Sequence, residues 1–370
     1  MNSLIKQNNT RIFGLDFIKV LAILLVLLSH SNYLIDSSNA LLISLSGLFS
    51  FIGIELFIGL SGYFIGTLLL KQFVLDTFSL KNIFVFFKTR GMRILPKYYF
   101  ILIINIAIAF FLEYPLRNVH LYFFFFQNFS TYHITFFSES WIFTIEQFTY
   151  TLFPLSLLLI LNIKKKYSKK WLFLFNVMFL IVLAHILRYF NMKNENIVSM
   201  ENWDKKIYSL VIYHFDAILF GVLLSWVYHF YMGFLKKYRV YFLIIGMHLF
   251  FIQFVLLNVL GVDIVSCPIY FNVFYFTLSS TIFCLTLPCF VFWKTSSTIF
   301  SKLVCFISKA SYTAYLIHFS IVAVLIKYFL GQMNYAMSSV EILILYLAVT
   351  FAFSYLVNRI FQKIKMDNQG

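Results

Sequence analysis

Several ionisable side chains stand inside long apolar segments of this 370-residue chain, where a charge is costly and a functional role is the default expectation. In the first such segment, Lys19 and His30 are eleven residues apart. On a helix this spacing places them on nearly the same face and about 16 Å apart. An imidazole can accept a proton near neutral pH, and an ammonium can bind an anion. The pair predicts a functional face that runs part of the way across a membrane; the alternative for His30 is an ordinary helix-end histidine.

Two arginines could bind phosphate. Arg90 and Arg93 are three residues apart at the entrance to the third apolar segment, so they share a helix face. Guanidinium groups grip phosphate oxygens bidentately, which makes this pair a candidate anion site. The competing interpretation is cationic anchoring at the cytoplasmic surface of a membrane.

Three carboxylates complete the candidate set. Asp16 lies three residues before Lys19 and can pair with it. Glu55 lies in an apolar run without a partner nearby in the sequence, so we expect it to pair with an arginine or with Lys19. Glu146 lies about a turn and a half into the fourth apolar segment, where anchoring or packing does not explain it.

Other side chains in these segments are weaker candidates. Trp141 fits the aromatic belt at the outer membrane interface, and Gly59 and Gly62 permit close helix packing. Polar groups within or beside later segments are Tyr150, His214, Asp216 and His318.

The composition places these residues in a polytopic membrane protein. Sixty-one per cent of the residues are hydrophobic and 12% are charged, against about 45–50% and 25% in soluble domains. We predict an all-α fold with about ten transmembrane helices, at residues 12–32, 41–70, 94–113, 141–163, 171–190, 207–231, 240–260, 269–293, 310–330 and 340–362.

The charge pattern predicts the topology. Placing both termini in the cytoplasm puts most of the 29 Lys and Arg residues in inner loops and leaves six outside, among them Arg188. This asymmetry accounts for most of the +15 net charge, so no nucleic-acid partner is expected. The four cysteines show no metal-binding spacing, and no metal is expected.

Taken in order, the motifs resemble the integral-membrane acyltransferase family 3, bacterial proteins that mostly O-acetylate cell-surface carbohydrates. The resemblance covers essentially the whole chain as one domain, residues 1–370, without an appended extracytoplasmic domain. It rests on five segments: Leu15–Lys19 with His30, Gly53–Tyr63, Arg90–Tyr98, Trp141–Pro154 and Ser311–His318. Lys19 stands where arginine is commoner, and His214 stands where arginine is expected before Asp216.

The resemblance implies an acyl-coenzyme A donor, acetyl-CoA first, and no permanently bound cofactor. Arg90 and Arg93 would bind its phosphates, with Lys19 near the thioester. His30 would be the catalytic base, acting directly or through an acyl-histidine, and Glu146 would orient an imidazole or bind a sugar hydroxyl. Asp16, Glu55, Trp141, Tyr150 and His318 remain ion-pair, structural or substrate-binding candidates.

The implied setting is the bacterial cytoplasmic membrane, where the lipid bilayer surrounds the protein. The acceptor would be a capsule, lipopolysaccharide, exopolysaccharide or similar carbohydrate. A competing function is the export of a polysaccharide or lipid-linked sugar, in which buried His and Glu would be proton or substrate sites. A transporter does not require the arginine pair or the His30 motif.

Overall fold

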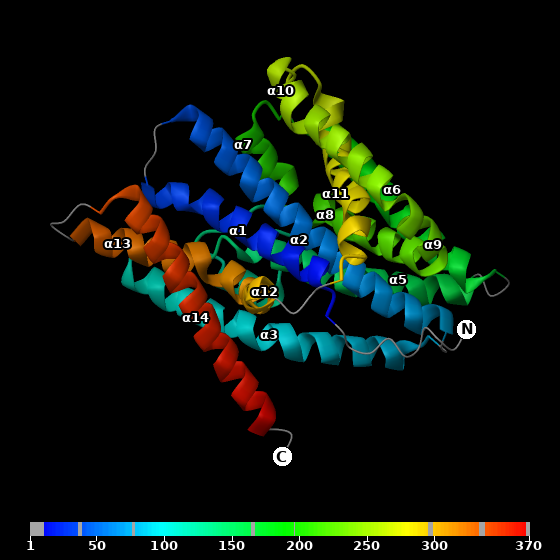
Figure 1. The fold of residues 1–370 in the computed structure, drawn as a ribbon, viewed down its shortest axis with the longest axis horizontal. Coiled ribbons are helices and arrows are strands. Elements are labelled where there is room, and N and C mark those ends of the chain that lie inside the picture. Colours follow the sequence, from blue (N-terminus) through cyan, green and yellow to red (C-terminus); the bar gives the residue numbers. More distant parts are fainter. Residues whose placement is uncertain are drawn as a thin grey trace.

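The computed structural model describes residues 11–35, 39–75, 78–163, 167–195, 197–294, 299–332 and 337–367. These residues form helices joined by loops, without a strand among them (Figure 1). The long helices are α1 (Phe13–Ile35), α2 (Ala40–Leu75), α3 (Leu80–Phe111), α5 (Ser140–Ile163), α6 (Lys169–Asn194), α9 (Asp216–Phe251), α11 (Tyr275–Val291), α12 (Ile299–Ile317) and α14 (Ser339–Asp367).

Short helical pieces link or continue them. They are α4 (Val119–Phe124), α7 (Met200–Trp203), η2 (Asp204–Tyr208), α8 (Val211–His214), η3 (Ile252–Leu256), α10 (Leu257–Val259), η4 (Tyr270–Phe274), η5 (His318–Ala323) and α13 (Val324–Gln332), where η denotes π-helix. Helices α12, η5 and α13 form one continuous run from Ile299 to Gln332.

Within the described residues, nine helical segments are long and apolar enough to cross a membrane. One of them, Val211–Val259, would extend about 74 Å if it were straight, more than twice the roughly 30 Å of a bilayer core. It is kinked at Tyr231, whose backbone is not helical. Beyond the kink the chain returns: the Phe254 ring contacts Phe51, which also contacts Tyr208. This segment therefore covers most of both predicted spans, 207–231 and 240–260.

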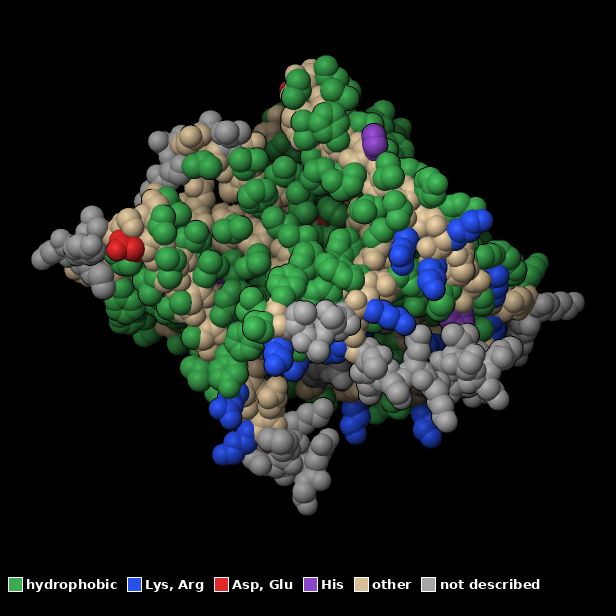
Figure 2. All heavy atoms as spheres, in the orientation of Figure 1, with side chains coloured by type: hydrophobic (Ala, Val, Ile, Leu, Met, Phe, Trp, Pro, Cys, Tyr) green, Lys and Arg blue, Asp and Glu red, His purple; other side chains and the backbone are tan. Residues whose placement is uncertain are grey.

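The all-α polytopic fold predicted from the sequence is confirmed. Figure 2 shows hydrophobic side chains over most of one face of the bundle, whereas Lys and Arg side chains gather along its lower border. A continuous apolar surface of this kind needs a lipid environment. The cytoplasmic position of the termini stays a prediction from the loop charges.

Helix α2 packs between α1 and α9, and two glycines allow the closest approach. A Cβ atom on Gly62 would lie 1.9 Å from the Ile218 carbonyl oxygen, and one on Gly221 would lie 2.2 Å from the Gly59 carbonyl oxygen. Such distances exclude any side chain, so backbones meet directly, as small residues allow in membrane bundles. The predicted packing role of Gly62 is confirmed, whereas a Cβ on Gly59 would meet open space.

We predict opposite outcomes for two substitutions in this helix. Gly62→Ala should destabilise the protein by about 3 kcal/mol or more, because α2 and α9 must separate. Gly59→Ala, one turn away, should be neutral or slightly stabilising, because alanine favours a helix and its Cβ meets nothing. Thermal unfolding of the purified protein in detergent would compare them; equal melting temperatures would contradict the proposed close contact.

Candidate functional site

A basic cavity of about 320 Å³ lies between α1, α2, α3, α5 and α12. Three cations line it, Lys19 from α1 and Arg90 and Lys97 from α3. The Lys19 ammonium lies 4.7 Å from the centre of the Phe64 ring, and most of the remaining wall is apolar or aromatic. Clustered cations beside apolar walls suit a ligand that carries both phosphate and apolar parts.

Near the start of α1, Asp16 pairs mainly with Arg11, and Lys19 lines the basic cavity. Asp16 accepts two hydrogen bonds from Arg11, at 2.7 and 2.9 Å, and a third from Ser308 at 2.7 Å. Lys19 Nζ lies 4.0 Å from the same carboxylate. The predicted Asp16–Lys19 pair is therefore present but secondary, because Arg11 is the principal partner.

Glu146 lies in the basic cavity together with two hydroxyl groups. Ser61 donates a hydrogen bond to Glu146 Oε1 at 2.5 Å and also bonds to the Tyr150 hydroxyl. The Arg90 guanidinium lies over the Tyr150 ring, 5.8 Å from its centre. The sequence motifs of α2, α3 and α5 thus meet at one place.

A second cavity, of about 200 Å³, contains the two predicted histidines and is called here the histidine cavity. Its described lining residues come from α1, α2, α5, the loop before α5, η2 with Ser209, α12 and η5: His30, Ser50, Ile54, Tyr132, Ser138, Glu139, Trp141, Asp204, Tyr208, Ser209, Tyr315 and His318. The His30 and His318 rings meet edge to face, 4.8 Å between their centres.

Backbone carbonyl groups orient both imidazoles in the same way. His30 Nδ1 lies 2.9 Å from the Val26 carbonyl oxygen, and His318 Nδ1 lies 2.6 Å from that of Tyr315. A neutral ring that donates from Nδ1 carries its lone pair on Nε2. The geometry therefore leaves Nε2 of each ring able to accept a proton.

Glu139 is a site residue that the sequence interpretation missed. Its carboxylate accepts hydrogen bonds from the backbone N–H groups of Phe319 and Ser320, both at 2.8 Å, and lies 3.8 Å from His318 Nδ1. These donors open the π-helical segment η5, which follows a distorted backbone at Ile317. Nothing in the local spacing of Glu139 marks it, because its partners lie 180 residues away along the chain.

The two predicted catalytic residues lie in different cavities. His30 lines the histidine cavity and Glu146 lines the basic cavity, and the two cavities share Tyr315 as a lining residue. The expectation that Glu146 orients an imidazole is therefore wrong in this structure, in which Glu139 is the carboxylate beside the histidines.

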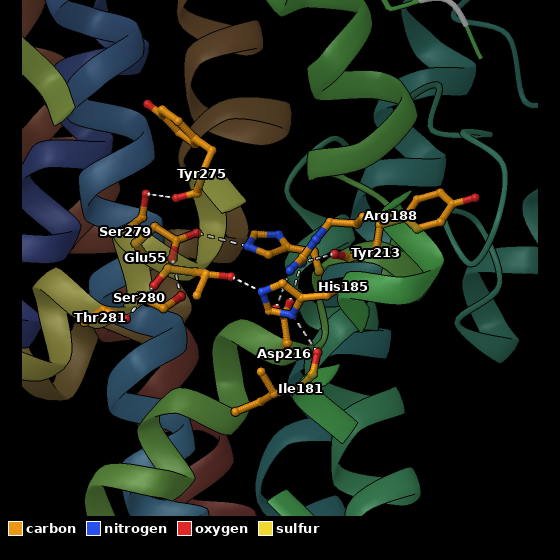
Figure 3. Close-up of polar contacts among 12 residues, drawn as sticks. Glu55, Ile181, His185, Arg188, Tyr213, Asp216, Tyr275, Ser279, Ser280 and Thr281 are labelled. Atoms are coloured by element: carbon orange, nitrogen blue, oxygen red, sulfur yellow. Dashed lines mark hydrogen bonds and ion pairs between the residues drawn. The ribbon is translucent and has the colours of Figure 1, made fainter. Parts of the chain in front are cut away.

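Glu55 belongs to a buried polar network and is not among the lining residues of either cavity (Figure 3). It lies 3.0 Å from His214 Nε2 and accepts a 3.4 Å hydrogen bond from Ser280. His214 Nδ1 contacts the Tyr208 carbonyl oxygen at 2.8 Å, so the ring bridges two elements. The predicted pairing of Glu55 with an arginine or Lys19 is wrong, and His214 gains a structural role.

Arg188 lies inside the bundle, on α6, and not in an outer loop. It is fully buried and forms a bidentate ion pair with Asp216, both contacts at 2.8 Å, and it donates to the Tyr213 carbonyl oxygen (Figure 3). The charge-based placement of Arg188 outside the membrane is therefore wrong. A buried guanidinium needs such a partner, because the bilayer supplies none.

Two further candidates have clear outcomes. Trp141 is not a belt residue facing lipid: its ring packs 5.0 Å from that of Tyr208 and 6.2 Å from that of His214. Arg93 belongs to α3, but its side chain lies outside the described residues.

Outside the spanning segments, burial raises the pKa of Asp204 to about 6, although the nearby Lys205 opposes this shift. Asp204 lines the histidine cavity and its residue as a whole remains accessible to solvent, so its carboxylate lies at the rim, where the surrounding protein desolvates it in part.

We predict that Arg188→Leu destabilises the protein by about 3–5 kcal/mol, because Asp216 is left buried without a counter-charge. Arg188→Leu combined with Asp216→Leu should recover most of that loss. Lys206→Ala is the matched control: it removes an exposed pair with Glu195 and should change stability by about 1 kcal/mol at most. Denaturant unfolding followed by circular dichroism measures all three. A single variant as stable as the double variant would contradict the coupling.

Comparison with known proteins identifies the family. A family model described as an acyltransferase domain matches residues 12–359. No curated protein and no solved structure matches the chain. The matched range contains both cavities and every candidate residue discussed above. The chain therefore belongs to acyltransferase family 3 and is a multi-pass membrane acyltransferase.

Proposed function

We propose that this protein transfers an acetyl or similar acyl group from acyl-coenzyme A to a hydroxyl of a cell-surface carbohydrate or its lipid-linked precursor. The observation that supports the proposal is the pairing of two cavities, one cationic and one containing two imidazoles, on either side of Tyr315. Its setting would be the bacterial cytoplasmic membrane.

The basic cavity would bind the donor. Coenzyme A carries several phosphate charges, and Lys19 from α1 and Arg90 and Lys97 from α3 offer cations to it. The apolar and aromatic surface beside them would contact the pantetheine arm. Arg93, on the same helix as Arg90, belongs to this proposal on the strength of its sequence motif.

The histidine cavity would bind the acceptor and activate it. Nε2 of His30 would take the proton from the acceptor hydroxyl as its oxygen attacks the thioester carbon, and coenzyme A would leave as the thiolate. Tyr315, shared by the cavities, marks where the thioester and the hydroxyl would meet. His318 lies against His30 and would help to position it.

We predict that His30→Ala and His30→Gln each lower acyl transfer from radiolabelled acetyl-CoA by more than ~100-fold, because the base is lost. His248→Ala is the matched control, since His248 is exposed and makes the same Nδ1 contact with a carbonyl one turn earlier. It should keep full activity. Turnover by either His30 variant at the wild-type rate would disprove the assignment of His30 as the base.

We further predict that Lys19→Ala and Arg90→Ala each raise KM for acetyl-CoA by roughly tenfold or more, because a charge-assisted contact is worth about 1.5–3 kcal/mol. The KM for the acceptor should change little. Lys302→Ala, an exposed lysine on α12 outside both cavities, is the control. Unchanged KM values for acetyl-CoA in both cavity variants would rule out this docking site.

A further inference from the structure

The histidine cavity differs in charge from the basic cavity. Its lining includes two carboxylates, Glu139 deep inside and Asp204 at the rim, and contains neither lysine nor arginine among the described residues. The basic cavity has three cations and one carboxylate, Glu146. A ligand that suits one cavity therefore does not suit the other.

The nearest cations along the chain form their ion pairs with carboxylates other than Asp204. Lys205 pairs with Glu201 at 2.7 Å, and Lys206 pairs with Glu195 at 2.6 Å. Each ammonium therefore already has its own carboxylate. The charge at the rim of the histidine cavity remains negative when Asp204 is ionised.

Two buried polar groups in the same cavity have no hydrogen-bond partner. The Tyr208 hydroxyl and His318 Nε2 are both buried and unbonded in the described structure. Buried polar groups are nearly always satisfied, so an unpaired donor and acceptor facing one cavity point to a ligand with hydroxyl groups. Trp141 adds an aromatic surface to the wall.

We propose, resting on the function proposed above, that the acylated residue is a sugar ring without a carboxylate or phosphate group. Neutral and amino sugars would meet the rim carboxylate without repulsion and hydrogen-bond to Asp204, Tyr208 and His318. An acidic sugar would face like charge in a cavity with no cation in its described lining. The volume of about 200 Å³ suits one monosaccharide residue at a time.

Ligand-observed saturation-transfer NMR on the purified protein would test this directly. The probes are three methyl glycosides with one ring scaffold: glucoside, glucosaminide and glucuronide. We expect the glucuronide to bind the wild-type protein about tenfold more weakly than the other two. Asp204→Asn should reduce the difference in affinity between the glucuronide and the other two glycosides at least several-fold. Asp204→Lys should make the glucuronide the tightest binder of the three.

Asp263→Asn is the matched control, because it removes an aspartate that is exposed and does not line the cavity. It should leave the order of binding unchanged. Equal binding of all three glycosides by the wild-type protein, binding of none, or an unchanged order in Asp204→Lys would each overturn the inference. The acetyl-transfer assay of the His30 variants is independent of these signals, so failure of the proposed function would be recognised separately.

Discussion

Inside a bilayer, a polar group can be satisfied only by the protein itself, and this constraint organises the whole bundle. The Arg188–Asp216 pair and the Glu55–His214 contact both satisfy it, and each links two different helices. They join α6 to α9 and α2 to α8. Lys19 and Glu146 line the basic cavity, His30 and His318 line the histidine cavity, and these are groups available for chemistry.

The same constraint explains how His318 comes to lie beside His30. A distortion at Ile317 interrupts the regular α-helical ladder and frees backbone N–H groups at the start of η5. The Glu139 carboxylate accepts hydrogen bonds from two of them. A carboxylate placed before α5 thus stabilises a non-α-helical turn in a distant helix.

The two cavities separate the cations from the imidazoles. Cations and the Ser61–Glu146–Tyr150 cluster lie on one side of Tyr315, and the imidazoles lie on the other. The proposed polyanionic donor and hydroxyl acceptor would then be held in environments of opposite electrostatic character. Under the proposed function, only the thioester end of the donor needs to reach Tyr315, so the phosphates stay with the cations. This arrangement favours transfer of an acyl group over passage of the whole substrate.

The sequence by itself determined the fold class, the approximate spans and several of the residues that line the cavities. Long apolar runs and isolated charges within them are local signals, since hydrophobicity and helical spacing can be read from neighbouring residues. The spacing of Lys19 and His30 on α1 is such a signal, and both residues line cavities, although not the same one.

Only the tertiary structure decided which groups are partners. The partner of Glu55 is 159 residues away and that of Glu139 is 180 residues away, and no local spacing encodes such pairings. The charge count likewise misplaced Arg188, because counting cations cannot distinguish a loop residue from one paired inside the bundle. Ion pairs and shared cavities depend on how helices pack in three dimensions, whereas the sequence specifies directly only what each helix presents on its own faces.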